Sequence, residues 1–276
     1  MKPAGKARLP PAASRRNGAG LLSRLPDAAL SAIGVAALIG IWTALTVTGV
    51  IGPDYLPSPV QLAKEGVTLF TQGYKGISIW QHIGASLFRT LAGFGLGVLL
   101  GVPAGLYTGY SRVANALVSP VMAFVRPIPP IAFIPMTVLY FGLGEVGKVV
   151  LIFFTAFNYA YVNAHAGAAN VPIAYYRAAQ SIGLTAGQTF FRVTLPAAIP
   201  QIFTGLKVAM ALSWAVVVAA ELVGAQKGLG FMISDAAQLF LIPVVFIGIA
   251  LIGAIGLLLN GILSGLETHL VHWKGR

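Results

Sequence analysis

The sequence predicts an all-α integral membrane protein that crosses the bilayer six times. Hydrophobic residues make up 57% of its 276 positions and charged residues only 9%, and the mean hydropathy is +0.83. A soluble domain usually carries about 25% charged residues. Long apolar runs recur along the chain, and a spanning helix needs about 20 mostly apolar residues. Both observations argue against a soluble globular domain.

The apolar runs define the expected spans in order. The third run is long and interrupted by prolines. Between the first two, Ser58-Pro59 predicts the start of a short interfacial helix that ends near Gly73. The spans are expected at residues 28–50, 86–109, 113–142, 148–169, 199–224 and 239–266, within one transmembrane domain at 27–276.

Residues 1–26 are rich in Pro, Ala and Arg and have no apolar face, so we predict a disordered basic cytoplasmic arm. A signal peptide would be a short apolar stretch with a small-residue cleavage site. The arm is followed instead by a full span from Ala28, which favours its retention.

Lys and Arg predict the orientation, because cytoplasmic loops carry an excess of both. With the N-terminus inside, six spans also leave the C-terminus inside. The inside segments then hold eleven Lys and Arg residues and the outside segments four. This bias explains the net charge of +11 without a nucleic-acid partner and predicts that both termini are cytoplasmic.

The segment between the fourth and fifth spans is unusually polar and reads NVPIAYYRAAQSIGLTAGQTFFRVTLPAAIP. Pro172 suits a first helical position and Gly183 suits the residue after a helix end. Thr185 and Gln188 have the spacing of a capping box, which predicts a second helix. A plain loop would join two spans with fewer residues. Two capped helices therefore favour a docking element.

Ala178, Ala179 and Ile182 lie on one face of the first helix, where small residues let another protein approach closely. The spacing Ala178-Ala179, three residues, Gly183, nine residues, Val193-Thr194-Leu195-Pro196 resembles the "EAA" loop of ABC importer permeases. That pattern is Glu-Ala-Ala, three residues, Gly, nine residues, Ile-x-Leu-Pro. One position departs from it, because Arg177 stands where the motif has Glu, so any ion pair of that Glu does not carry over.

The resemblance extends along most of the chain. RPIPPIAFIPMTVLYFGLGEVGK (126–148) is similar to the third span of the nitrate, sulfonate and taurine permeases, and GLKVAMALSWAVVVAAELVGAQKGLGFMI (205–233) is similar to their fifth span. Taurine permeases look most similar, since they also resemble RAAQSIG with Arg in the Glu position. The implied fold is that of a type I ABC importer permease with six spans, in the bacterial inner (plasma) membrane.

The resemblance also implies partners and a mechanism. The implied assembly contains two permeases, a cytoplasmic ABC ATPase dimer and a periplasmic substrate-binding protein, surrounded by membrane lipid. ATP and Mg would bind the ATPase, and this chain would bind no cofactor. Residues 170–198, the coupling loop, would contact the ATPase and switch the spans between inward and outward opening. The implied contact residues are Arg177, Ala178, Ala179, Ser181, Ile182, Gly183, Leu184, Leu195 and Pro196.

Two ionisable residues within the expected spans are candidates for the substrate path. Arg126 precedes Pro127 and Pro130, and prolines free backbone carbonyls that can line a cavity. Glu221 is the one acid within a span. A guanidinium could meet a sulfonate and a carboxylate an ammonium; the alternative is a structural ion pair or snorkelling. Arg89 is expected to snorkel from the outer end of the second span.

Other chemistries lack a sequence signal. There is no Cys, the four His residues lack metal-ligand spacing, and no GxxxxGK[ST] loop is present. We therefore expect no metal site and no ATPase activity in this chain. A secondary transporter would be expected to show inverted repeats and several intramembrane acids, and an intramembrane enzyme would need paired catalytic residues. Taurine is the favoured substrate, with other alkanesulfonates, nitrate and small organic acids open.

Overall fold

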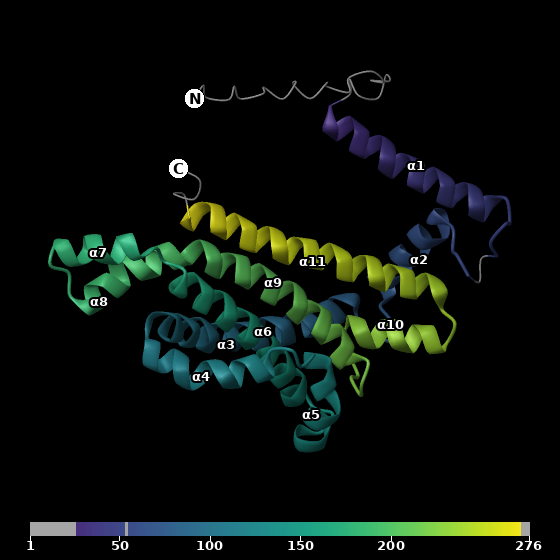
Figure 1. Ribbon diagram of the computed structural model, residues 1–276. Coiled ribbons are helices and arrows are strands. Elements are labelled where there is room, and N and C mark those ends of the chain that lie inside the picture. Colours follow the sequence, from purple (N-terminus) through teal and green to yellow (C-terminus); the bar gives the residue numbers. More distant parts are fainter. Residues whose placement is uncertain (1–25, 53–54, 272–276) are drawn as a thin grey trace, which may run out of the picture. The chain divides into compact units, whose positions relative to one another are not determined.

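The computed structural model describes residues 26–52 and 55–271, and this part of the chain is predominantly helical (Figure 1). It forms two compact units, residues 1–59 and 60–276. Most of the predicted basic arm and residues 272–276 lie outside the described residues.

The first unit contains one helix, α1 (Asp27–Val47). It is apolar around its circumference and is one of the helices long enough to cross a membrane. Trp42 Nε1 donates a hydrogen bond to the carbonyl of Pro57, 3.1 Å away. A helix that is hydrophobic all round suits a lipid environment, which agrees with the first expected span.

The second unit holds the remaining helices. The expected interfacial helix is present as α2 and is followed by Gly73, whose φ of +77° ends it. A 3₁₀ turn (Pro130–Phe133) and a π-helical segment (Phe190–Thr194) connect longer helices. The helices are α2 (Pro59–Gln72), α3 (Ile79–Tyr110), α4 (Arg112–Val125), α5 (Ile134–Phe141), α6 (Glu145–Ala169), α7 (Ile173–Ser181), α8 (Ala186–Thr189), α9 (Leu195–Glu221), α10 (Leu229–Gln238) and α11 (Ile242–Leu270).

Five helical stretches of the described chain are long and apolar enough to span a membrane, and α4 with α5 makes a sixth if the two are one broken span. The break bends the chain by 82° between Val125 and Pro130. Prolines at 127, 129 and 130 supply no amide hydrogens there, so a straight helix cannot continue. The third expected span, 113–142, is thus two short helices.

The other expected spans also differ from the helices at their ends. The second begins at Ile79 instead of residue 86, because Ser78 caps the helix by accepting from the Trp80 amide. The sixth begins at Ile242 instead of 239, and a separate helix, α10, precedes it. The fifth lies within an unbroken helical run from Ala186 to Glu221.

Helices α3, α6 and α9 lie side by side (Figure 1). A row of glycines every four residues on α3 faces α6. A Cβ on Gly97 would stand 2.6 Å from the Cβ of Ala156, and one on Gly105 would stand 2.3 Å from the carbonyl oxygen of Tyr161. Small residues allow such close backbone approach between membrane helices. The row is Gly93, Gly97, Gly101, Gly105 and Gly109.

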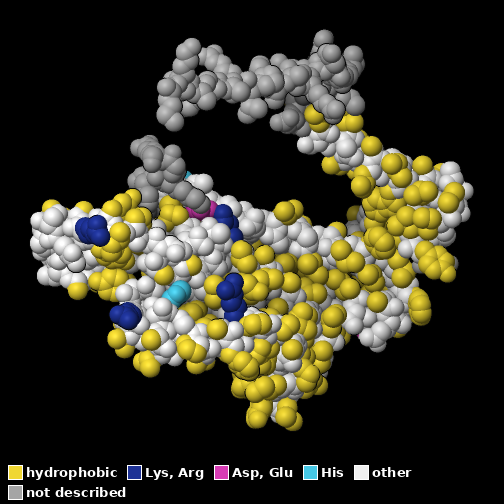
Figure 2. Space-filling view, viewed as in Figure 1, with side chains coloured by type: hydrophobic (Ala, Val, Ile, Leu, Met, Phe, Trp, Pro, Cys, Tyr) yellow, Lys and Arg dark blue, Asp and Glu magenta, His cyan; other side chains and the backbone are white. Residues whose placement is uncertain are grey.

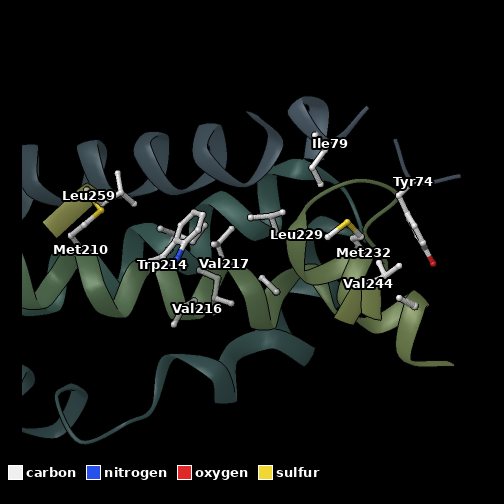
Figure 3. Packing of buried hydrophobic residues seen from close by; sticks show 14 of the residues in the cluster. Tyr74, Ile79, Met210, Trp214, Val216, Val217, Leu229, Met232, Val244 and Leu259 are labelled. Atoms are coloured by element: carbon white, nitrogen blue, oxygen red, sulfur yellow. The ribbon is translucent and has the colours of Figure 1, made fainter. Parts of the chain in front are cut away.

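The main apolar core surrounds the second half of α9 (Figure 3). Trp214 and Val217 of α9 pack among Ile79 of α3 and Leu229 and Met232 of α10. The Trp214 indole donates a hydrogen bond to the carbonyl of Ile252 in α11, at 2.9 Å. One continuous helix, α9, therefore links this core with the coupling loop at its N-terminal end.

Candidate functional site

The coupling loop contains the two capped helices that its sequence predicts. The first is α7, for which Pro172 is the N-cap instead of the first helical residue. Gly183 has φ +76° and follows the helix end. Its amide donates to the carbonyl of Gln180, and the amide of Leu184 donates to that of Ala179, both at 3.0 Å. This Schellman motif requires a left-handed residue at 183, which glycine adopts without steric cost.

The capping box at the second helix is also confirmed. The Thr185 hydroxyl accepts from the Gln188 amide at 3.3 Å, and the Gln188 side chain accepts from the Thr185 amide at 3.0 Å. The helix α8 is only one turn long and passes through the π-helical segment into α9. The coupling loop is therefore joined to α9 by continuous helical backbone.

The exposed face of the coupling loop is an apolar groove of about 430 Å³. Ile182 is 74% exposed and Ala178 is exposed, whereas Ala179 is only 3% exposed and forms its floor. The three residues predicted to share a face therefore line one groove. Its lining is Tyr175, Ala178, Ala179, Ile182, Leu184, Arg192, Val193, Pro196 and Ala197.

Three of the expected contact residues have other surroundings. Leu195 packs against a small core of α3, α6 and α9 residues and so anchors the loop. The Ser181 hydroxyl donates to the carbonyl of Ala178 within α7, at 2.9 Å. Arg177 is exposed, and its guanidinium makes no ion pair with any residue that the structure describes.

Tyr110, the last residue of α3, joins that helix to the coupling loop. Its hydroxyl donates to the carbonyl of Ala186 at 3.0 Å, and its ring meets the ring of Phe190 edge-on at 5.3 Å. The hydroxyls of Tyr176 and Thr194 lie 3.2 Å apart within the loop. Nothing in the sequence points to Tyr110, because the residues that it contacts lie far from it along the chain, Ala186 being 76 residues away.

An ion-pair cluster lies at the other end of α9 and consists of the buried residues Ser86, Arg89 and Glu221 and the exposed residue Glu145. The expectation that Arg89 snorkels is wrong, since the residue is 1% exposed. Its Nε and Nη2 donate to Glu145 at 2.5 and 2.6 Å, and its Nη1 donates to Glu221 at 2.6 Å. Because α3 begins at Ile79, Arg89 lies well inside that helix and faces α6 and α9.

Glu221 has a complete set of partners within the chain. The Ser86 hydroxyl donates to it at 2.8 Å, and the amide of Gly230 donates at 2.9 Å. The same hydroxyl accepts from the amide of Leu229, also at 2.9 Å. A buried charge with this many hydrogen bonds is typical of an ion pair that holds helices together. The geometry favours the structural alternative for Glu221 over a place in the substrate path.

Glycines let the loop after α9 approach this carboxylate. Gly228 has φ +132°, and a Cβ there would lie 2.4 Å from Cδ of Glu221. A Cβ on Gly230 would lie 2.5 Å from the carbonyl of Val218. His82 Nδ1 lies 3.1 Å from both the amide nitrogen and the carbonyl oxygen of Gly228. The Gly-Leu-Gly sequence at 228–230 therefore supplies the backbone amides that donate to the ion-pair cluster.

Arg126 lies away from the cluster, at the break between α4 and α5. It is the C-cap of α4 and is exposed, as is Pro127, while Pro130 is half-buried. Glu221 pairs with Arg89 and not with Arg126. The surface around α5 in Figure 2 is covered with hydrophobic side chains. Arg126 thus remains a candidate for the substrate path without Glu221.

No group of three His, Asp or Glu side chains is placed to hold a metal ion in the described part of the chain.

Comparison with known proteins decides the family. Residues 97–273 match the model of the binding-protein-dependent transport system inner membrane component. The chain belongs to this family of transport permeases. The matched region holds the coupling loop, Arg126 and Glu221, whereas Ser86 and Arg89 precede it.

Several permeases of named transport systems are similar to this one over most of their length. The taurine transport system permease of Escherichia coli (strain K12) is 37% identical over 87% of this chain and 88% of that protein. The putative aliphatic sulfonates transport permease of Bacillus subtilis (strain 168) is 32% identical, covering 87% and 85%. The nitrate import permease of Synechocystis sp. is 33% identical, covering 89% and 90%.

The fold is that of the ABC importer permeases. An inward-facing structure of the MetNI methionine ABC transporter aligns with a TM-score of 0.60 and 19% identity. The alignment covers 72% of this permease and 98% of that chain. The type I importer fold predicted from the sequence is confirmed, and the permease is a multi-pass protein of the inner membrane.

Proposed function

We propose that this permease imports taurine or a related sulfonate by alternating access, driven by a separate ATPase that docks on the coupling loop. The observation that carries the proposal is the exposed helix, glycine and capped helix continuous with α9, in a chain without a nucleotide-binding loop. ATP and Mg would bind the ATPase dimer, and a periplasmic binding protein would deliver the substrate.

The substrate is the finer part of the proposal. Taurine follows from the 37% identity to the taurine system permease. Aliphatic sulfonates and nitrate follow from relatives at 32 and 33%, and a bicarbonate permease of Synechococcus elongatus is also 32% identical. All are small oxyanions or carry an oxyanion group. Uptake competition among these four compounds would rank them.

The proposed orientation places the coupling loop and both termini in the cytoplasm. Lys207 Nζ lies 2.6 Å from Glu267 Oε2, which joins the last turn of α11 to the half of α9 that follows the coupling loop. The end of α11 and the coupling loop therefore lie on the same side of the helices. The excess of Lys and Arg in these segments supports a cytoplasmic position for that side.

The proposed assembly contains two copies of the permease. Each chain has one coupling loop, and a pair of ATPases offers two docking grooves, so a two-fold arrangement satisfies both. Co-purification of the tagged permease with its ATPase, followed by native mass spectrometry, tests this. We expect two permeases per ATPase pair. One permease per pair would contradict the homodimer, and uptake by a permease without any ATPase would indicate a secondary transporter.

A further inference from the structure

The coupling loop carries positive charge and no negative charge. The sequence contains no Asp or Glu between Glu145 and Glu221, a stretch that includes the whole loop. Arg177 on α7 and Arg192 on the π-helical segment are both exposed. Figure 2 shows one dark-blue patch at the end of the second unit that α7 and α8 form. Any partner that covers this surface meets uncompensated guanidinium groups.

One of the two arginines lies in the apolar groove, and the other lies elsewhere on the exposed surface of α7. Arg192 is part of the lining, whereas Arg177 is not and is on a different face of α7 from Ala178. Neither guanidinium makes an ion pair within the described residues, unlike Arg89 and Lys207. The exposed apolar side chains of Tyr175 and Ile182 project from the same surface. The exposed surface of the coupling loop thus combines an apolar groove that includes Arg192 with a second guanidinium, that of Arg177, on another face of α7.

A partner that buries this surface must compensate the positive charges of its exposed guanidinium groups. Covering an exposed guanidinium without a partner removes its hydration, whereas a carboxylate can accept two parallel hydrogen bonds from it. Opposite charges at an interface rim mainly set specificity and the rate of association. The motif that the loop resembles has Glu in place of Arg177, so a partner suited to that Glu would present the wrong charge here.

We infer that the groove of the partner ATPase carries at least one Asp or Glu carboxylate that faces Arg177 when α7 docks. The inference rests on the proposed function and adds the chemistry of the partner surface. It also means that this permease discriminates against ATPases whose groove is basic at that point.

The test measures the affinity of the ATPase for the permease reconstituted in nanodiscs. Four permeases are compared: wild type, Arg177→Lys, Arg177→Glu and Arg112→Glu. Arg112 is an exposed arginine that begins α4, outside the coupling loop, so it is the matched control for the change of charge. We expect Arg177→Glu to weaken binding about tenfold or more, with Arg177→Lys and Arg112→Glu close to wild type.

A charge reversal on the other side completes the test. Each Asp and Glu on the rim of the ATPase groove is changed to Lys in turn. We expect one such variant to bind the Arg177→Glu permease better than it binds wild type. If no ATPase variant does so, or if Arg177→Glu binds as wild type, the carboxylate is absent and the inference is overturned.

Two further arms separate this inference from its alternatives. Nanodiscs of phosphatidylcholine alone and with anionic lipid are compared; an effect of Arg177→Glu seen only with anionic lipid would overturn the inference in favour of a lipid contact. Ile182→Ser removes an exposed apolar contact of the same groove. If Ile182→Ser weakens binding while Arg177→Glu does not, the docking site stands and the charge inference fails. If neither matters, the proposed docking site itself fails.

Discussion

Arg89 and Arg177 are the same residue type at the two ends of α9, and the chain uses them in opposite ways. Arg89 is 1% exposed and donates four hydrogen bonds, to Glu145, Glu221 and the carbonyl of Lys227. Arg177 is exposed and has no acid anywhere in its loop. A charge that the chain compensates stabilises the fold, whereas a charge that it leaves uncompensated is available to a partner.

The largest expected effect is on stability and is at the ion-pair cluster. Arg89→Ala leaves the carboxylate of Glu221 buried without its cation, and breaking a buried pair in this way costs about 3–5 kcal/mol. We expect a large drop in the thermal unfolding midpoint of the purified permease. Arg177→Ala is the control and should leave the midpoint unchanged. Equal midpoints for wild type and Arg89→Ala would show that the ion-pair cluster does not hold the helices.

Gly183→Val changes the coupling loop, and we expect it to affect ATP-coupled uptake and not folding. Gly183 has φ +76°, and a left-handed conformation costs an ordinary residue about 1–2 kcal/mol and a β-branched one more. We expect ATP-coupled uptake to fall several-fold while membrane insertion is normal. Gly187→Val is a matched control, because both positions have open space for a Cβ but only Gly183 has positive φ. Equal uptake in both variants would refute the requirement for this helix end.

Arg126→Ala tests an arginine that lies neither in the ion-pair cluster nor in the coupling loop. If Arg126 lines the substrate path, its planar fork can hold an oxyanion transiently. We then expect a moderate reduction in uptake per assembled complex, with partial rescue by Arg126→Lys, which keeps the charge. Equal normalised uptake in wild type and both variants, with lower expression or thermal stability of Arg126→Ala, would instead assign it a structural role.

The smallest effect on stability is expected at a partly exposed ion pair. Lys75 and the hydroxyl of Tyr74 both lie 2.6 Å from Oδ2 of Asp235 on α10. Hydrogen bonds from these two groups lower the pKa of Asp235 below its ordinary value of 3.8, while burial and the same carboxylate raise the pKa of Tyr74. Exposed pairs of this kind contribute about 0–1 kcal/mol.

The sign of the pH dependence follows from the lowered pKa of Asp235. The carboxylate stabilises the fold above its ordinary pKa, and this contribution is lost as the pH falls through the lower pKa of the folded state. We expect Asp235→Asn to reduce the unfolding midpoint slightly at neutral pH, and the difference from wild type to disappear in strong acid. A constant difference across this range would exclude ionisation of Asp235 as its cause.

Features that depend only on residues close in sequence could be predicted. Apolar runs predicted the spans. Gly183, Thr185 and Gln188 predicted the helix ends of the coupling loop, because helix caps form between residues close in sequence. The prolines after Arg126 indicated an interrupted span, though not a bend of 82°. These features need no knowledge of how distant helices pack.

The ion-pair cluster could not be predicted in the same way. Arg89 and Glu221 are 132 residues apart, and their pairing depends on how α3 packs against α9. The sequence marks Glu221 as unusual and leaves a structural ion pair open, but it does not identify Arg89 as the partner. α10 was missed because its 10 residues are too few for a membrane span, the signal by which the helices were recognised.

The most direct test of the account is uptake of radiolabelled taurine into proteoliposomes that contain the permease and its ATPase. We predict that uptake requires ATP on the side of the membrane that carries the ATPase. It also requires the binding protein on the opposite side. Gly183→Val should abolish most of it, and Gly187→Val should not. Uptake driven by an ion gradient in the absence of the ATPase would contradict the account, because the coupling loop would then have no role in transport.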